Sequence, residues 1–205
     1  MRKSREEAAQ TRQRILETAA IEFRRTGISG TGLADLMGAA GLTSGGFYRH
    51  FDSKDDLVKE SFAVAVNSVT AWIERFVKGR PGAAGILAAV EDYLSVSNRD
   101  SVACCPYVTL GSEVARGSVA VREAATSAFM KQIGVISAHL PGRSRAAAKK
   151  EALSLVFTMI GAMTVARMVS DRELSASILT QARKNIRQQL QEKRTKAKKS
   201  RRIAL

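Results

Sequence analysis

The chain has few of the residues that usually supply disulfide, metal and nucleophile chemistry. Its 205 residues include two cysteines, two histidines and three prolines, and 5% of them are aromatic. Two cysteines do not make a disulfide framework, and His139 has no partner at metal-ligand spacing. We also find no nucleophile–base constellation and no phosphate-cradling loop. The sequence therefore predicts no enzyme, no metal and no cofactor.

Long hydrophobic runs are also missing. No apolar stretch reaches the length of a membrane-spanning helix, and the first residues lack the apolar stretch of a secretory signal peptide. Hydrophobic residues nevertheless make up 45% of the chain, which suits an alanine-rich helical protein with a sizeable core. We expect a cytoplasmic protein that does not associate with a membrane.

Acidic residues are scarce at the C-terminal end, and this explains most of the net charge of +14. Residues 1–60 carry 10 Lys or Arg and 9 Asp or Glu, whereas residues 183–205 carry 10 and 1. We expect residues 193–205 to be a disordered, solvated basic tail. The alternative is an arm that adds non-specific DNA affinity by releasing counterions.

The segment Thr31–Leu57 is the most informative part of the sequence. Leu33, Leu36 and Met37 recur at helical spacing and define one buried face. Gly41 follows at the point where this helix must stop, and glycine accepts a positive φ there without strain. This pattern predicts a short helix followed by a tight turn.

A second helix is predicted after the turn, with Thr43 as its N-cap. Its first residues are small, which leaves room for a close approach of the backbone to DNA. Phe47 and Phe51 are four residues apart and should anchor this helix to the core. Ser53 and Asp56 match a capping box, so a third helix should begin at about residue 54.

These features resemble the DNA-binding domain of the TetR family of bacterial transcriptional regulators. Ala40–Leu42, Phe47–Phe51 and Ser53–Leu57 stand at the family's spacing, as does the preceding helix from Thr11 to Gly27. The resemblance implies an all-α protein with a three-helix DNA-binding domain and a larger helical ligand-binding and dimerisation domain. The expected divisions are a basic N-terminal arm at 1–7, the DNA-binding domain at 8–66 with its helix-turn-helix at about 32–51, the helical domain at 67–192 and the basic tail at 193–205.

The resemblance also implies which residues contact double-stranded DNA. The candidates are Thr43, Ser44, Gly45, Gly46, Tyr48, Arg49, His50 and Lys54. Some of these fix the register through phosphates, while others lie near base edges. Arg49 is the best candidate for reading guanine, unless it is solvated or bound to a phosphate, and His50 could instead hold the turn together. Arg2, Lys3 and Arg5 are further candidates for phosphate contacts, whereas Arg12 and Arg14 are expected to be solvated.

The first helix of the motif departs from the family pattern. The family usually has a polar or basic residue where Ala34 stands and often one at Gly38, so we expect few base contacts from this helix. Gly32 and Gly38 each weaken it by roughly 1 kcal/mol relative to alanine. We hypothesise that the motif becomes fully ordered only on DNA, which amide exchange with and without DNA would test.

The rest of the chain is predicted to be helical. The expected helices cover residues 54–76, 83–96, 107–116, 118–139, 146–169 and 173–190, with breaks at 79–82 and 140–143 and a loop at 98–101. The last two helices resemble those through which TetR-type proteins dimerise. The candidate interface residues are Leu153, Phe157, Ile160, Met163, Ile178, Leu179, Ala182 and Ile186, although these could instead form intramolecular core.

An effector pocket is expected within the helical domain. The candidate lining residues are Trp72, Phe76, Tyr93, Tyr107, Phe129 and Met159, each of which could equally be core. They suggest an apolar or aromatic small molecule. Glu113 and Arg116 lie in the same segment and could equally be surface charges.

The sequence therefore predicts a homodimeric repressor that a small-molecule effector releases from a palindromic operator. One alternative is a regulator in which Cys104 or Cys105 senses oxidants or electrophiles, whereas both thiols could simply pack at a helix start. Another alternative is a basic architectural protein, which would show little sequence preference on DNA.

Overall fold

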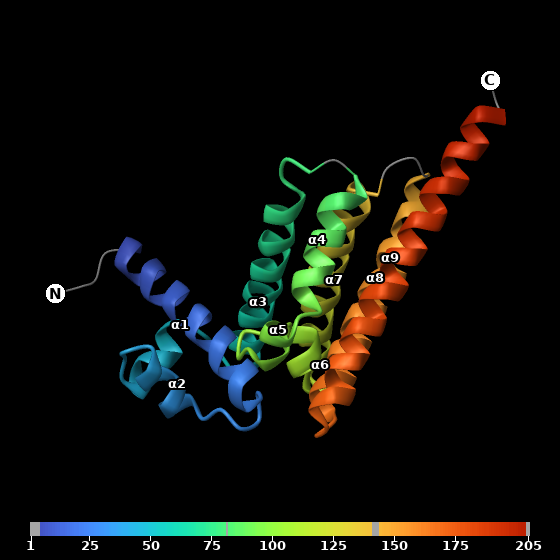
Figure 1. Cartoon of the computed structure of the whole chain (residues 1–205). Helices are drawn as coiled ribbons and strands as arrows, with labels where there is room; N and C mark the ends of the chain where they lie inside the picture. The colour runs from blue at the N-terminus through green and yellow to red at the C-terminus, as the bar shows by residue number, and fades with distance from the viewer. Residues whose placement is uncertain (1–4, 81, 141–143, 204–205) are drawn as a thin grey trace. The chain divides into compact units, whose positions relative to one another are not determined.

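The computed structural model describes residues 5–80, 82–140 and 144–203, with side chains as far as Gln191. Within these residues the chain is helical and contains no strand, which confirms the all-α prediction (Figure 1). The helices are α1 (Arg5–Thr26), α2 (Leu33–Ala39), the 3₁₀ helix η1 (Ser44–Arg49), α3 (Lys54–Val77), α4 (Ala83–Tyr93), α5 (Val96–Asp100), α6 (Pro106–Arg116), α7 (Val119–Ala138), α8 (Arg145–Met168) and α9 (Arg172–Ile203).

Several helix boundaries follow from local capping chemistry. The Ser53 hydroxyl accepts a hydrogen bond from the Asp56 N–H at 3.1 Å, so α3 begins at the predicted residue. Ser144 caps α8 in the same way through the Ala147 N–H at 3.2 Å. The predicted loop at 98–101 is wrong for its first three residues, because Ser95 accepts the Asn98 N–H and starts the short helix α5.

The chain divides into two compact units. Within the described residues, the first unit comprises 5–69 and 102–129. Its core joins Phe23, Met37 and Phe47 of the N-terminal helices to Leu110 of α6. The sequence predicted a boundary near residue 66, and packing adds the later segment to the N-terminal helices.

The second unit comprises residues 70–101 and 130–203 of the described chain. Its longest helices, α8 and α9, pack against each other as consecutive antiparallel helices. Their buried residues recur every three or four positions, as expected for helices with one core-facing stripe. These residues are Leu155, Met159, Met163 and Ala166 on α8, and Leu179, Ala182, Ile186 and Leu190 on α9.

The backbone of α9 continues as a helix to Ile203, which corrects the expectation of a disordered tail at 193–205. The segment from Arg172 to Ile203 contains no glycine or proline, and Lys, Arg, Gln and Ala are strong helix formers. Residues 204 and 205 lie outside the described chain, as do Arg2 and Lys3 of the predicted N-terminal arm. Arg5 is the exposed first residue of α1.

The helix α8 is long and apolar enough to cross a membrane when judged by length and composition alone. No such stretch was predicted from the sequence. Core helices of proteins without a membrane pass the same test, and α8 is partly buried against α9. We therefore interpret α8 as a packing helix.

Candidate nucleic-acid interface

The helix-turn-helix of the first unit is built from α2, a turn at Gly41 and η1. Gly41 has a φ of 68°, as the sequence predicted. The turn is closed by the Leu42 N–H, which donates to the Met37 carbonyl at 2.9 Å. This geometry places the backbone of η1 directly after a sharp reversal of the chain.

The predicted second helix of the motif is present, and it is a 3₁₀ helix. Thr43 has the extended conformation of an N-cap, but its side chain makes no capping hydrogen bond, which corrects the predicted role. The first turn is instead closed by the Gly46 N–H on the Thr43 carbonyl at 3.0 Å. Ser44, Gly45 and Gly46 have weak helix propensity, which explains why this segment forms a short 3₁₀ helix.

Two phenylalanines fix η1 to the core, as predicted. Phe47 and Phe51 are buried, and their rings stack with centroids 5.6 Å apart. Tyr48 lies between them in sequence, yet 71% of its surface is exposed. Because an aromatic side chain with this exposure gains little from folding, it is available to a binding partner.

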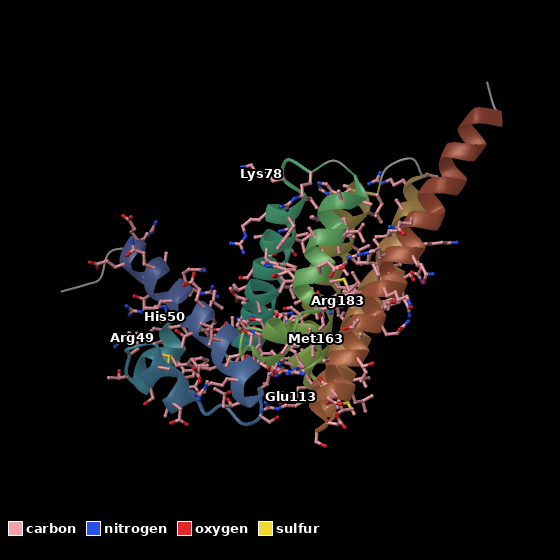
Figure 2. All side chains as sticks on the ribbon, viewed as in Figure 1. Arg49, His50, Lys78, Glu113, Met163 and Arg183 are labelled. Carbon is pink, nitrogen blue, oxygen red and sulfur yellow. The ribbon has the colours of Figure 1, made fainter. Side chains whose placement is uncertain are left out.

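The exposed residues of η1 form the candidate interface. Thr43, Ser44, Gly45, Tyr48 and Arg49 are exposed, whereas Gly46 and His50 are half-buried. An ideal Cβ on Gly45 would meet no heavy atom within 4 Å, so the space beside this residue is open. Figure 2 labels Arg49 and His50 at the end of this segment.

Lys54 has partners that the sequence analysis missed. Its Nζ donates to the Ile28 carbonyl at 2.7 Å and to the Thr31 carbonyl at 2.8 Å. These hydrogen bonds tie the start of α3 to the loop that leads into α2. Contact with a DNA phosphate remains a prediction for Lys54, for which the ammonium group has one further N–H.

Arg12 is partly exposed, and it makes specific contacts that the sequence did not predict. Its guanidinium donates to the His50 carbonyl at 3.2 Å and pairs with Glu60 at 2.7 Å. It also lies over the Phe51 ring, 4.5 Å from the centroid. The hydrogen bond to Glu60 raises the pKa of Arg12. Arg12 thus joins α1, the end of η1 and α3.

Glu113 of α6 is a second residue whose role the sequence did not reveal. Its carboxylate accepts the Ile28 N–H at 3.0 Å and the Ser29 N–H at 2.8 Å (Figure 2). Partial burial raises the pKa of Glu113, but these backbone hydrogen bonds and the nearby Arg116 outweigh it, so the net pKa is lowered. The α1–α2 loop is therefore held through its N–H groups by Glu113 and through its carbonyls by Lys54.

The predicted pocket residues fall into two aromatic groups. In the first unit, Tyr107 packs edge-on against Phe62 and Phe129, with centroids 5.5 and 5.4 Å away. Its hydroxyl is buried without a hydrogen-bond partner, and burial raises its pKa. In the second unit, the ring centroid of Trp72 lies 5.0 Å from that of Phe76 and 6.5 Å from that of Tyr93. Met159 of α8 is buried.

The two cysteines form no disulfide and are buried at the start of α6. Cys105 is the N-cap residue and Pro106 is the first residue of the helix, a position that suits proline. The Arg24 guanidinium lies nearby and donates to the Ala103 carbonyl at 2.9 Å. Burial lowers the pKa of Arg24, and its interactions with the two cysteines act in the opposite direction.

The predicted dimer residues separate into two sets. Met163, Leu179, Ala182 and Ile186 are buried within the chain itself, because α8 and α9 pack through them, and they cannot offer a surface to a second copy. Leu153, Ile160 and Ile178 are half-buried, and Phe157 is 59% exposed. The sequence analysis missed the exposed Val165, Met168 and Leu174. Helical spacing from Phe157 could have found the first two.

Comparison with known families identifies the motif. A family model described as "Bacterial regulatory proteins, tetR family" matches residues 15–61, from the middle of α1 to the first turns of α3. Residues 15–61 are thus similar to the DNA-binding domain of the TetR family. The match covers the whole helix-turn-helix, including the turn at Gly41 and the exposed residues of η1.

Curated TetR-type relatives match the same domain. The regulator AcrR of Shigella flexneri is 40% identical over 68 residues, which is 33% of this chain and 32% of that protein. The regulator TtgR of Pseudomonas putida is 42% identical over 59 residues, or 29% of this chain and 28% of that protein. The matched segment thus spans about a third of the length of these relatives.

Solved structures extend the likeness of fold to the helical remainder. The reduced form of E. coli NemR has a TM-score of 0.71 at 23% identity, covering 86% of this chain and 95% of that one. A TetR transcriptional regulator from Legionella pneumophila has a TM-score of 0.72 at 19% identity, covering 92% and 99%. Most of this chain therefore has the same fold as these proteins.

Proposed function

We propose that the chain is a sequence-specific DNA-binding transcriptional regulator that acts as a homodimeric repressor in the bacterial cytoplasm. A small-molecule effector would release it from a palindromic operator. The TetR-family helix-turn-helix supports the DNA-binding part, and the names of relatives such as the probable acrEF/envCD operon repressor of Escherichia coli support the sign of regulation. The proposal includes no catalysis and no cofactor.

The observation that carries this proposal is the exposed polar surface of η1. Tyr48 and Arg49 are exposed on a short helix that the buried side chains of Phe47 and Phe51 anchor to the core. The open space at Gly45 leaves room for a close approach of the sugar-phosphate backbone. An arginine fork at Arg49 matches the O6 and N7 acceptors of guanine in the major groove, while the Tyr48 hydroxyl suits a phosphate.

Electrostatics favour placed contacts over general attraction at this domain. Residues 1–60 carry almost as many acidic as basic side chains, so their net field is weak. The basic end of α9 carries most of the positive charge of the chain and would add affinity without sequence information. Removing residues 193–205 should therefore reduce the salt dependence of DNA binding and leave the preferred sequence unchanged.

Homodimerisation is supported by the apolar surface that α8 and α9 leave uncovered. Phe157, Val165 and Met168 of α8 are exposed, as is Leu174 of α9. Exposed large apolar side chains on two adjacent helices are typical of an interface. A two-fold dimer would present two recognition helices to the two halves of a palindrome.

We propose that α6 transmits effector binding to the DNA-binding motif. Tyr107 on α6 belongs to an aromatic group with a buried, unpartnered hydroxyl, which an effector could satisfy. Glu113 on the same helix holds the loop before α2. An effector that favours a shifted α6 would weaken this hold, and its power to do so equals its differential affinity for the two states.

Selection of bound sequences from a random DNA pool tests the proposal. We expect one enriched palindrome, and we expect Arg49→Gln to relax the preference at one position per half-site by about 1–3 kcal/mol. Tyr48→Phe, which removes only the hydroxyl, should weaken binding to all sequences about equally. If no sequence is enriched, the protein binds as a general architectural protein and the proposal of a regulator fails.

A second candidate function is control by thiol oxidation. It is favoured by the position of Cys104 and Cys105 at the start of the helix that carries Glu113. Hydrogen peroxide would transfer one oxygen atom to a thiolate, giving a sulfenic acid and hydroxide. Peroxide should then release operator DNA from the wild type and not from the Cys104→Ser, Cys105→Ser variant. Release from both would remove this candidate.

A further inference from the structure

The second unit contains a groove that the proposed function does not use. It has a volume of about 360 Å³ and lies where α5 meets the turn between α8 and α9. Its polar walls are formed by Arg99, Asp100, Arg167, Ser170, Arg172 and Ser175. Three guanidinium groups and a single carboxylate thus line one concave site, which leaves two positive charges without a matching acid on its walls.

The three arginines differ in how much of their hydrogen-bonding capacity is already used. Arg99 makes two hydrogen bonds to Asp100, at 2.7 and 2.9 Å, and a third to the Ser175 hydroxyl at 2.7 Å. It is therefore neutralised and held in place. Its role in the groove is to fix the wall formed by α5 against α9.

Arg167 and Arg172 retain donors for a ligand. Arg167 uses one amino group, which donates to the Arg99 carbonyl and, at 3.4 Å, to the Ser101 carbonyl. Arg172 makes no hydrogen bond or close ion pair within the described part of the chain, although its charge acts at longer range on the Asp100 carboxylate that Arg99 already occupies. Two guanidiniums held beside each other repel, and a bound anion would remove that repulsion.

The carboxylate nearest to these two arginines in sequence is occupied elsewhere. Asp171 accepts the Glu173 N–H at 2.8 Å and the Leu174 N–H at 2.9 Å, so it caps α9. This cap keeps the turn between α8 and α9 in shape. Arg172 thus stands at the first position of a fixed helix.

We propose that this groove binds a phosphorylated small molecule, with Arg167 and Arg172 on the phosphate. A phosphate monoester carries a charge of roughly −1.5 to −2 at neutral pH, which complements three guanidiniums that share the single carboxylate of Asp100. The Ser170 hydroxyl is an additional donor on the same wall. The groove is much larger than one phosphate group, so it leaves space for the organic part of the molecule.

Isothermal titration of the full chain with glucose 6-phosphate and with inorganic phosphate tests this site, and glucose is the uncharged control. We expect one glucose 6-phosphate per chain, no binding of glucose, and a loss of at least about tenfold in affinity in Arg172→Gln. Arg172→Lys keeps the charge and loses the planar guanidinium. Its affinity for glucose 6-phosphate should lie between those of the wild type and Arg172→Gln. Circular dichroism would check that each variant is folded.

The matched control is Arg145→Gln, which removes the same charge from an exposed position on α8 outside the groove. Equal weakening in both Gln variants would show general attraction to a basic chain and overturn the proposal, as would binding of neither probe. Binding of inorganic phosphate alone would support the oxyanion site and assign it to the free ion. The proposal would also be overturned, in favour of DNA as the ligand, if a short DNA duplex displaced glucose 6-phosphate while Arg172→Gln bound glucose 6-phosphate as tightly as the wild type.

Discussion

At the scale of single residues, the loop between α1 and α2 is controlled by two opposite charges. Lys54 donates hydrogen bonds to two carbonyl oxygens, and Glu113 accepts hydrogen bonds from two N–H groups. The sequence indicated other roles for both side chains: a phosphate contact for Lys54, and either a pocket residue or a surface charge for Glu113. Each assignment leads to a different outcome when the residue is changed, so mutation can distinguish them.

Lys54→Met should lower the free energy of unfolding of the DNA-free protein by about 1–3 kcal/mol, because two carbonyls lose a charged donor. Urea denaturation measures this change. Lys59→Met is the matched control on the same helix, since Lys59 pairs with Asp56 across one helical turn, and its effect on stability should be much smaller. An unchanged stability of Lys54→Met would leave the phosphate contact as the main role of Lys54.

Glu113 should make the protein sensitive to acid. Its folded-state pKa lies below the ordinary value of 4.5, so its contribution to stability is fully present above that value and is lost as the pH falls through the lower, folded-state pKa. Urea denaturation of wild type and Glu113→Gln should therefore show a difference at pH 7 that shrinks below about pH 4. Glu123→Gln, at an exposed site on α7, should show no such convergence, and a parallel pH dependence of all three proteins would contradict the prediction.

At the scale of elements, the contact between α3 and α4 depends on the absence of a side chain. An ideal Cβ on Gly85 would lie 2.6 Å from the Cα of Val77 and 2.9 Å from the carbonyl oxygen of Phe76. Both neighbours are backbone atoms, which cannot move aside without shifting a helix. The close approach of these two helices therefore requires glycine at this position.

Gly85→Ala should destabilise the protein by about 1–3 kcal/mol through overpacking. Gly134→Ala is the matched control, because an ideal Cβ on this glycine of α7 meets no heavy atom within 4 Å. That change should stabilise the protein by about 0.5–1 kcal/mol, since alanine loses less entropy in a helix. Thermal unfolding of the two variants should thus shift in opposite directions, and a shift in the same direction would refute the argument from close packing.

Local signals explain which elements could be predicted from the sequence. Gly41, Ser53 and Pro106 act on their own neighbours, so the turn and the starts of α3 and α6 were predictable to within a residue or two. The partners of Arg12, Lys54 and Glu113 are 23 to 85 residues away. Helical periodicity identifies a buried face and does not identify what covers it, which is why these contacts could not be derived.

Misassigned segments have equally physical causes. The basic run after residue 192 reads as solvated charge, yet it consists of strong helix formers that continue α9. The segment 102–129 follows the second unit's first helices in sequence but packs with the N-terminal ones. The expected interface on α8 and α9 mixed core and surface residues because both faces of α8 are apolar.

At the scale of the whole molecule, the uncovered apolar surface of α8 and α9 determines the expected oligomer. Met168 is 76% exposed and Phe157 is 59% exposed, so a charge at either position perturbs little of the monomer. In a dimer the same charge would be buried without a partner. This contrast separates assembly from folding.

Met168→Glu should convert the protein to a monomer in sedimentation equilibrium while its helical circular dichroism is unchanged. Its affinity for an operator palindrome should fall by at least about tenfold, because each half-site then binds separately. Val119→Glu controls for the added charge at an exposed valine, 61% accessible, outside α8 and α9. A dimeric Met168→Glu would place the interface elsewhere.

The hold of Glu113 on Ile28 and Ser29 has a consequence for the construction of hybrid regulators. A chimera that grafts residues 1–66 onto the ligand-responsive part of another family member separates the loop from its own α6. The two N–H groups would lose their acceptor unless the recipient supplies a carboxylate at the equivalent position. Grafts from this chain should therefore include residues 102–129 together with the DNA-binding helices. Otherwise the recipient protein needs a glutamate at the position equivalent to Glu113.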